Sequence, residues 1–530
     1  MGCHNSQELV DKQIAVHESA IRDLRTLRNT HASISKLPVE VLSEIFLLAK
    51  LPPGILYRER HEKRGWLNVA GVCRNWREIT LNAPRKWDTL NTSKLNTLEW
   101  AETFIARSKY VPLHVSCTYP HHATPRAVLD LVFSHVERFQ DLEISLDTSH
   151  NAKIQDIIDL PSPCVLRSLA LYNQGPLFSA NTGGIGRFLS EAQMPYLRTL
   201  DVRHFELPQT ISVLPQLRRL CYLPPMGTSR TTVAAMLSFL RSTPSLEHLD
   251  ILSALRPLDN GGKETATVEL TKLSSLSYTT PEFGDLSLFR FLHYPPSLRV
   301  KFSSSFPPPD TAACTDDLAS ILTRVGESDA AATAEVISLT AMEHDYFDVQ
   351  VSSHDGPMID IRFPVLEILP LLKLPTKLPC SGSRTLRIRG FHSVTVSDWA
   401  SFFTRHPQVR DLTAVEVDAS FFRALLRPSE NEPPPFMGIQ RLVLSSCDIE
   451  EDTTLFKRVL EEHRHLEADV GVTLEIEGCR VAADTIRELE AYAKVVWDGI
   501  KKLGVDSEED SEDSDDDGDS DDSDEDSDYN

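Results

Sequence analysis

The chain has 530 residues, 41% of them hydrophobic, and a formal net charge of −23. The last 25 residues hold 16 Asp or Glu and no Lys or Arg, so the body without them carries a net charge of only −7. A mildly acidic body argues against nucleic-acid binding, which uses Lys and Arg gathered on one face. No apolar run reaches the roughly 18 residues of a membrane span, and the N-terminus lacks the apolar core of a secretory signal.

Nine cysteines are scattered along the chain without a C-x-x-C pair. An odd, dispersed set argues against a disulfide framework and against a zinc site. Such cysteines are typical of small buried residues in a reducing compartment. We therefore expect a cytoplasmic or nuclear protein with neither a metal site nor a cofactor.

The opening MGCHNS fits the pattern for N-myristoylation, with Gly2 as the acceptor and Ser6 at the required position. Cys3 offers a place for a second acyl chain, which matters because one chain anchors a protein only marginally. No polybasic segment follows. The alternative is an unmodified terminus, and we expect membrane association only if Gly2 and Cys3 are acylated.

Within an N-terminal segment 1–33, residues 7–31 carry apolar side chains at spacings of three and four, which predicts a helix. Two inner positions are polar, His17 and Arg28, and the pattern lasts for under four heptads. We therefore expect a helix that packs against the segment after it, with a dimerising coiled coil as the alternative. The apolar inner positions are Val10, Ile14, Ile21 and Leu24.

Residues 34–90 predict a small helical unit. Its first helix is expected to begin near Pro38, which is pre-set for a first turn, and to end before Pro52. About fifty residues bury too little surface to fold alone, so the unit must lie against the rest of the chain, another protein, or both. A second helix, about 66–80, places on one face Val69, Val72, Cys73, Trp76 and Ile79.

Three stretches of this unit, LPVEVLSEIF, VCRNWREI and NAPRKW, resemble in that order the F-box-like domain common in fungal proteins. The resemblance implies a three-helix motif that docks on the Skp-type adaptor of a cullin-based ubiquitin ligase. The connector RERHEKRG is longer than in compact F-boxes, which affects the loop more than the docking faces. The alternative is a helical hairpin buried in a larger domain. The positions that match the apolar pattern, and so would bind the adaptor, are Leu37, Pro38, Val41, Ile45, Phe46, Val72, Cys73 and Trp76.

Residues 95–503 alternate helical and strand patterns, and a phrase L-x-x-L-x-apolar recurs. The gaps between its first leucines are 31, 20, 29 and 27 residues, close to the roughly 20–29 of leucine-rich repeats. One strand and one helix cannot bury their own apolar face, so stacked copies predict an irregular leucine-rich-repeat-like solenoid. The expected fold class is α/β: a short helical F-box followed by this solenoid. The first leucines are Leu166, Leu197, Leu217, Leu246 and Leu273.

In this phrase the alternating leucines are expected to point into the core, while the residues between them face the concave side. Arginine recurs at those positions in three phrases, as Arg167, Arg198, Arg218 and Arg219. A mildly basic strip suits an acidic partner, and an ordinary solvated face is the alternative.

The C-terminal part is less regular. Residues 305–335 break the rhythm, either as a loop or as a seam between two arcs, and 482–503 predict an amphipathic helix that caps the stack. The tail 505–530 is expected to be disordered, because it has almost no apolar residue and repels itself. Its alternatives are contact with a basic partner or phosphorylation, since an acid follows three residues after Ser507, Ser514 and Ser523.

The motifs G-x-S-x-G, H-E-x-x-H and G-x-x-x-x-G-K-[ST] are all absent from the sequence, so we expect no enzymatic activity. The leading hypothesis is a substrate-receptor subunit of an SCF-type ligase. Its F-box would bind the Skp-type adaptor, and through it a cullin, while the repeats bind an unknown target protein. The alternative is a non-catalytic interaction scaffold, lipid-anchored at its N-terminus.

Overall fold

The computed structural model describes residues 2–48, 68–92, 97–117, 126–146, 165–173, 194–205, 207, 214–224, 231–252, 255–256, 267–280, 286–295, 297–306, 316, 318, 321, 334–341, 346–353, 356–364, 382–392, 394–427, 434–436, 438–450, 452–464, 472–479 and 481–500. The charged connector and the acidic tail, both singled out above, lie outside these residues.

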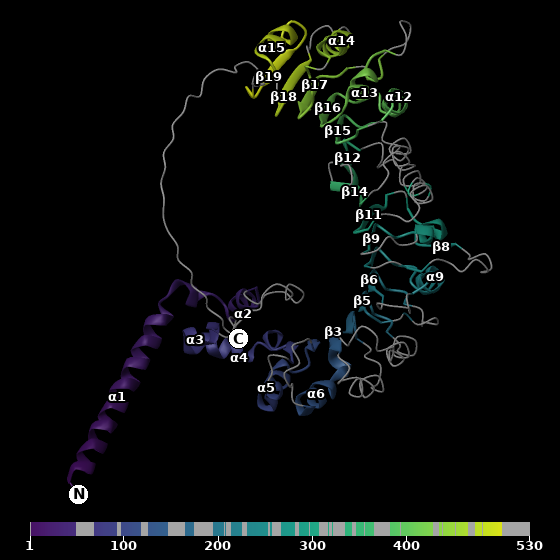
Figure 1. Cartoon of the computed structure of the whole chain (residues 1–530). Helices are drawn as coiled ribbons and strands as arrows, with labels where there is room; N and C mark the ends of the chain where they lie inside the picture. Colours follow the sequence, from purple (N-terminus) through teal and green to yellow (C-terminus); the bar gives the residue numbers. More distant parts are fainter. Residues whose placement is uncertain are drawn as a thin grey trace, which may run out of the picture.

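One large sheet dominates the described chain. It has 17 strands, most of them parallel, and a second sheet has two. Figure 1 shows the strands stacked along an arc, with the strands on its inner side and the helices on its outer side. With 11 α-helices in the described ranges, the fold is mixed α/β with a large, mostly parallel sheet.

The N-terminal elements are helical. The helix expected near Pro38 is confirmed, and the Pro38 carbonyl accepts a hydrogen bond from the Leu42 N–H at 3.0 Å. The second helix is broken at Cys73, whose backbone is extended (φ −156°, ψ 169°). The turn before this break contains Gly71 and two valines, residues of low helix propensity. The elements are α1 (Gly2–Thr30), the 3-10 turn η1 (Ser33–Lys36), α2 (Val39–Leu48), α3 (Val69–Val72), α4 (Arg74–Asn82) and the 3-10 turn η3 (Pro84–Lys86).

In the first half of the sheet the predicted strands are confirmed, and described α-helices lie directly before β2, β3 and β7. Each recurrent phrase forms a strand, and each strand pairs in parallel with the next phrase along the chain. The strands are β1 (Thr89–Asn91), β2 (Leu113–Cys117), β3 (Phe139–Leu146), β4 (Ser168–Asn173), β5 (Thr199–Arg203), β6 (Arg219–Leu223), β7 (His248–Ile251) and β9 (Ser275–Thr280). The helical elements are α5 (Leu98–Ser108), α6 (Arg126–Phe133), η4 (Val136–Arg138) and α9 (Val233–Arg241).

The degenerate phrases of the second half also form strands. These are β11 (Arg299–Ser304), β15 (Thr385–Arg389), β16 (Asp411–Val415), β17 (Arg441–Ser445) and β18 (Thr473–Glu477). Between them lie α12 (Val396–Phe403), α13 (Ala419–Arg423) and α14 (Thr453–Arg464). The small sheet pairs β8 (Val268–Glu269) with β10 (Leu292–His293), beside the 3-10 turn η5 (Leu286–Phe291).

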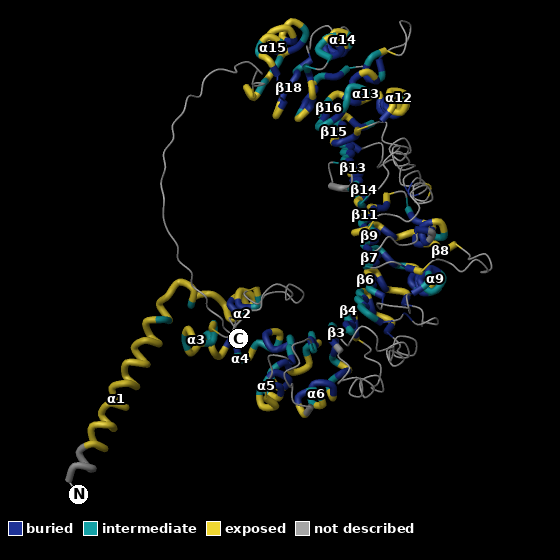
Figure 2. The backbone as a smooth tube through the Cα atoms, in the orientation of Figure 1, coloured by how far each residue is buried: buried dark blue, intermediate teal, exposed yellow. Residues whose placement is uncertain are grey.

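A single apolar row runs across all 17 strands of the large sheet. At one matching register position, each strand contributes one buried Leu, Val or Ile, except for the final, partly buried valine. These side chains face the outer helices, so burial is continuous along the arc (Figure 2). We call this set the apolar row; it comprises Leu90, Val115, Leu142, Leu169, Leu200, Leu220, Leu249, Leu276, Val300, Ile359, Val351, Ile337, Leu386, Leu412, Leu442, Leu474 and Val495.

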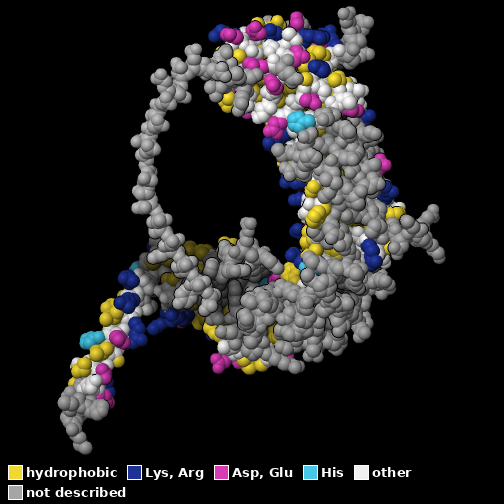
Figure 3. All heavy atoms as spheres, in the orientation of Figure 1, with side chains coloured by type: hydrophobic (Ala, Val, Ile, Leu, Met, Phe, Trp, Pro, Cys, Tyr) yellow, Lys and Arg dark blue, Asp and Glu magenta, His cyan; other side chains and the backbone are white. Residues whose placement is uncertain are grey.

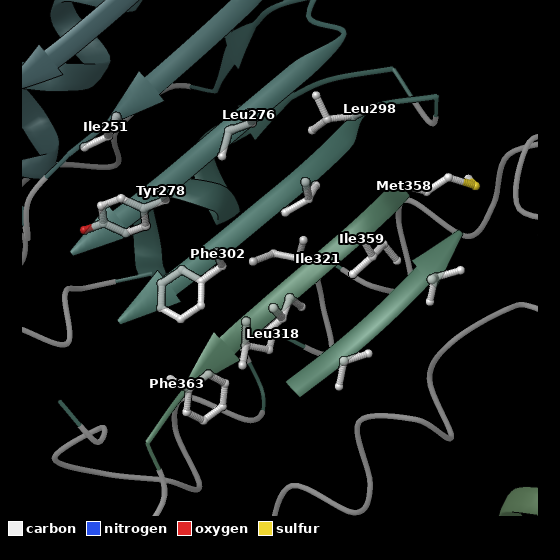
Figure 4. Close-up of a cluster of buried hydrophobic side chains, with 14 of the residues drawn as sticks. Ile251, Leu276, Tyr278, Leu298, Phe302, Leu318, Ile321, Met358, Ile359 and Phe363 are labelled. Carbon is white, nitrogen blue, oxygen red and sulfur yellow. The ribbon is translucent and has the colours of Figure 1, made fainter. Parts of the chain in front are cut away.

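The middle of the sheet contains an antiparallel insertion that the repeat pattern does not predict. β12 (Val336–Ala341), β13 (Phe347–Ser353) and β14 (Gly356–Phe363) form a meander, in which β14 pairs in parallel with β11 and β12 with β15. Figure 4 shows the junction, where Phe302 and Phe363 lie on neighbouring strands with ring centroids 6.1 Å apart. Leu318 and Ile321, from the stretch that breaks the rhythm, are buried in the same core.

α1 does not pack against the helical unit as expected. Its apolar side chains are exposed along its length, including Leu9 at 62% and Leu24 at 66% (Figure 2), and it contacts η1 at its C-terminal end. The inner line of the helix is interrupted by His17 and Arg28, so it lacks one continuous apolar stripe.

The helix predicted over residues 482–503 is shorter in the structure than expected. The helix α15 covers only Ala483–Leu489, and Lys494–Trp497 form the strand β19, which pairs in parallel with β18. The pair Val495–Val496 favours a strand, and β19 covers the edge that β18 would otherwise expose. Val495 thereby adds the last member of the apolar row.

Acidification is expected to destabilise the C-terminal part through His463 of α14, which is 4% exposed. Burial lowers the pKa of His463 to about 4, against 6.5 for the free side chain. Below pH 6.5 His463 therefore takes up a proton in the unfolded chain, whereas in the folded chain it stays neutral down to about pH 4. The free energy of unfolding falls as the pH drops through this window. The loss by pH 4 is about 3 kcal/mol.

His463→Leu should remove this contribution. Chemical denaturation of both proteins between pH 7 and pH 4 measures it as a flatter pH dependence in the variant. Identical pH profiles for the two proteins would contradict the assignment.

Candidate functional site

The helical unit has a small core of its own. Leu42 and Phe46 of α2 are buried with Ile79 of α4, separately from the core of the sheet. The rings of Phe46 and Trp76 pack with centroids 4.9 Å apart, and Val69 closes the cluster. Leu42 and Phe46 are one helical turn apart, so one face of α2 is used to hold α4.

The eight predicted adaptor-binding residues fall into two groups. Phe46 is only 3% exposed, and Cys73 and Trp76 are half-buried, so Phe46 and Trp76 serve to hold the helices together. The other five are exposed: Leu37, Pro38, Val41, Ile45 and Val72.

α2 therefore carries a second apolar face that no described residue covers. Val41, Ile45 and Leu48 follow one another at spacings of four and three, which places them on one side of the helix. Their exposed fractions are 42%, 40% and 84%, respectively. We call these three residues the α2 apolar face. Leu48 was not among the predicted binding residues.

Trp87 joins the helical unit to the sheet. Its side chain is 2% exposed and belongs to the core of the sheet, yet its indole N–H donates to the Thr80 carbonyl of α4 at 3.2 Å. Its ring packs on Phe104 of α5 with centroids 5.0 Å apart. The guanidinium of Arg107 lies 5.1 Å from the ring centroid and donates to the Leu81 carbonyl at 3.1 Å. We call this the Trp87 joint; it fixes α4 relative to α5.

The inner face of the sheet is the second candidate site. Residues at matching positions of neighbouring parallel strands lie side by side, about 4.8 Å apart. One inner row passes through Glu143, Ala170, Asp201, Cys221 and Asp250. These five positions carry three carboxylates and no cation, so the inner face is not uniformly basic.

The arginines of the predicted basic strip are partly neutralised. Arg218 lies 3.3 Å from Glu247, and Arg219 lies 3.3 Å from Asp250, each on the neighbouring strand or its entry. Figure 3 shows Lys and Arg side chains along the inner side of the arc, interspersed with apolar ones. The predicted basic strip is therefore a surface that carries both positive and negative side chains.

One part of this face with fixed polar groups lies over β2 to β5. The Ser116 hydroxyl donates to Glu143 at 2.9 Å, and burial raises the pKa of that carboxyl while this bond opposes the rise. Arg203 donates twice to Asp201, at 3.0 and 2.9 Å, and its guanidinium lies 4.9 Å from the Tyr172 ring centroid. These groups are held in place before any partner arrives.

Burial holds two cysteine thiols, on the strands β2 and β6, in their neutral form. Burial raises the pKa of Cys221, on the inner face, to about 12, and that of Cys117, which packs against the core, to about 12, so both thiols are neutral at pH 7. Within the described residues, no three His, Cys, Asp or Glu side chains are grouped to hold a metal ion. The arrangement is suited to recognising a polar surface by fixed hydrogen-bonding groups.

No family model matches the chain, and no curated protein matches its sequence. Among the described helices, none combines the length and apolar character needed to cross a bilayer. The backbone of α1 includes Gly2 and Cys3, but the surroundings of these two residues are not described, so acylation there stays a prediction.

The two faces of α2 predict opposite effects of truncation. Phe46→Ala leaves a cavity in the small core and should destabilise the helical unit by about 3 kcal/mol. This loss corresponds to amide exchange in α2 and α4 that is about a hundredfold faster. Ile45→Ala, one position earlier, should change exchange by less than about threefold, because its side chain lies on the surface. Hydrogen exchange with mass spectrometry measures both, and equal effects would contradict the division.

Proposed function

We propose that this chain is the substrate-receptor subunit of an SCF-type cullin ubiquitin ligase. In this proposal the α2 apolar face, with Leu37, Pro38 and Val72 beside it, binds the Skp-type adaptor. The adaptor connects the chain to a cullin. The sheet binds the target protein.

The observation that carries the proposal is the two-sided apolar character of α2. One face of α2 is buried against α4, while Val41, Ile45 and Leu48 stay exposed on the other. Apolar side chains gathered on one exposed face mark an interaction site, because leaving them in water forgoes the free energy of burial. The resemblance of the surrounding sequence to F-box-like domains names the partner.

We further propose that residues 95–503 form an irregular leucine-rich-repeat-like solenoid. The parallel strands, the helices on one side and the apolar row support this, since each unit then buries the apolar face of its neighbour. The inner face of such an array is broad and has fixed charge pairs. It is suited to a folded protein partner of mixed charge.

The proposal assigns no catalysis to this chain. Ubiquitin transfer would be carried out by other subunits, and the chain would raise the local concentration of target lysines near the activated ubiquitin. The Trp87 joint supports this role, because it fixes the α2 apolar face relative to the sheet that holds the target. A reducing, cytoplasmic or nuclear compartment is proposed on the same cysteine pattern as before.

The direct test is binding of the purified chain to a recombinant Skp-type adaptor. Val41→Asp and Ile45→Asp should each weaken binding by at least about a hundredfold, because a charge is buried without a partner. Both side chains are exposed in the free chain, so neither substitution should unfold it.

Val496→Asp is the matched control, because Val496 is also an exposed valine, at 50%, but lies on β19 at the far end of the sheet. It should bind as the unaltered chain does. Adaptor binding that survives both α2 substitutions, or that is absent from the unaltered chain, would overturn the proposal and favour a non-catalytic interaction scaffold.

A further inference from the structure

A basic cleft lies where the C-terminal half of α1 meets the helical unit. It has a volume of about 590 Å³ and is bounded by α1, η1 and the junction of α3 with α4. Four arginines line it, three from α1 and one from α4, together with Trp76. We call this the arginine cleft; its arginines are Arg22, Arg25, Arg28 and Arg74.

The position of α1 around this cleft is fixed by the turn that follows it. The N–H of Ala32 donates to the Asn29 carbonyl at 3.1 Å, and the Ser35 hydroxyl donates to the same carbonyl at 2.7 Å. These bonds fold η1 back on the last turn of α1. As a result, side chains at 22, 25 and 28, which are spaced by three residues, share one side of the helix and line the cleft.

The positive charge of the cleft is not neutralised within the described part of the chain. None of the four guanidinium groups lies within 4.0 Å of a described carboxylate; Arg22 donates only to the Glu18 backbone carbonyl, at 3.1 Å. Arg74 also stands at the amino end of α4, whose first turn contains no acid. A cation is unfavourable at this positive end of a helix. An anion in the cleft would therefore relieve two repulsions, that among the arginines and that between Arg74 and the amino end of α4.

The sequence of this chain contains a segment of the complementary charge. Residues 505–530 hold 16 acids and no basic residue, while residues 22–28, which contain three of the cleft arginines, hold one acid, Asp23. Carboxylates accept paired hydrogen bonds from guanidinium groups, which makes an acidic peptide a suitable ligand for closely spaced arginines.

The tail is long enough to reach the cleft. β1, next to the helical unit, and β19, next to the tail, are the two ends of the sheet, since they pair only with β2 and β18 respectively. Seventeen strands at about 4.8 Å extend about 77 Å along the arc, and the direct path across it is shorter (Figure 1). The 30 residues after Ile500 span up to about 100 Å when extended.

We propose that the arginine cleft binds an acidic peptide and that its occupant is the acidic tail of the same chain. The attraction is electrostatic, so it weakens as salt screens the charges. Phosphate on Ser507, Ser514 or Ser523 strengthens it by adding negative charge. Val72, which belongs to the proposed adaptor site, also lines the cleft. If the proposed adaptor site is correct, a bound tail therefore competes with the adaptor.

The test uses nitrogen-15-labelled full-length chain without adaptor, so it is independent of the proposed ligase function. In 50 mM salt, the tail amide signals of the unaltered chain should be broadened. In 500 mM salt, or with Arg22→Gln, Arg25→Gln and Arg28→Gln combined, they should become sharp. The matched control combines Arg241→Gln, Arg290→Gln and Arg405→Gln, three exposed arginines of the sheet region, with the same change in net charge. It should behave as the unaltered chain does.

Three results would overturn the proposal. The tail signals of the unaltered chain are already as sharp in low salt as those of the cleft variant. The control variant releases the tail as fully as the cleft variant, which means that attraction is diffuse. The broadening disappears on dilution at constant salt, which means that the tail binds another molecule instead of its own cleft.

Discussion

The structure depends on one repeated constraint: each strand of the large sheet must place one aliphatic side chain at the same register position. The apolar row is the result, and it is covered by helices on the outer side of the arc. A strand that slipped by one residue would turn its aliphatic side chain to the inner face and its polar ones to the core. The same constraint leaves the alternate positions free to carry charge, which is why the inner face can specialise for binding.

Two cores of very different size follow from this arrangement. The sheet has one continuous core, whereas α2 and α4 share only Leu42, Phe46 and Ile79, with partly buried neighbours. So small a core has little stability of its own. The Trp87 joint compensates by attaching α4 to the core of the sheet. It also makes the orientation of the α2 apolar face a property of the whole molecule rather than of a flexible appendage.

The sequence predicts most of the parallel strands, because the leucine spacing reports directly on side chains buried in every unit. It misses the meander of β12 to β14, where alternation without that phrase marks an antiparallel insertion. It also misplaces β19, because Val495–Val496 fits a helical pattern as well as a strand. For the site, the F-box-like pattern pointed to the apolar residues of α2, but separating Phe46 from Ile45 required knowing which face α4 covers. The arginine cleft joins residues 22–28 to residue 74, a proximity that no local pattern contains.

In the proposed function the helical unit is a docking element and the sheet a separate binding surface. Hydrogen exchange of the full chain, alone and saturated with the Skp-type adaptor, tests it most directly. The account predicts new protection confined to residues 37–48 and 69–76, with the strands of the sheet unchanged. Protection on the inner face of the sheet instead, or no change anywhere, would contradict the account.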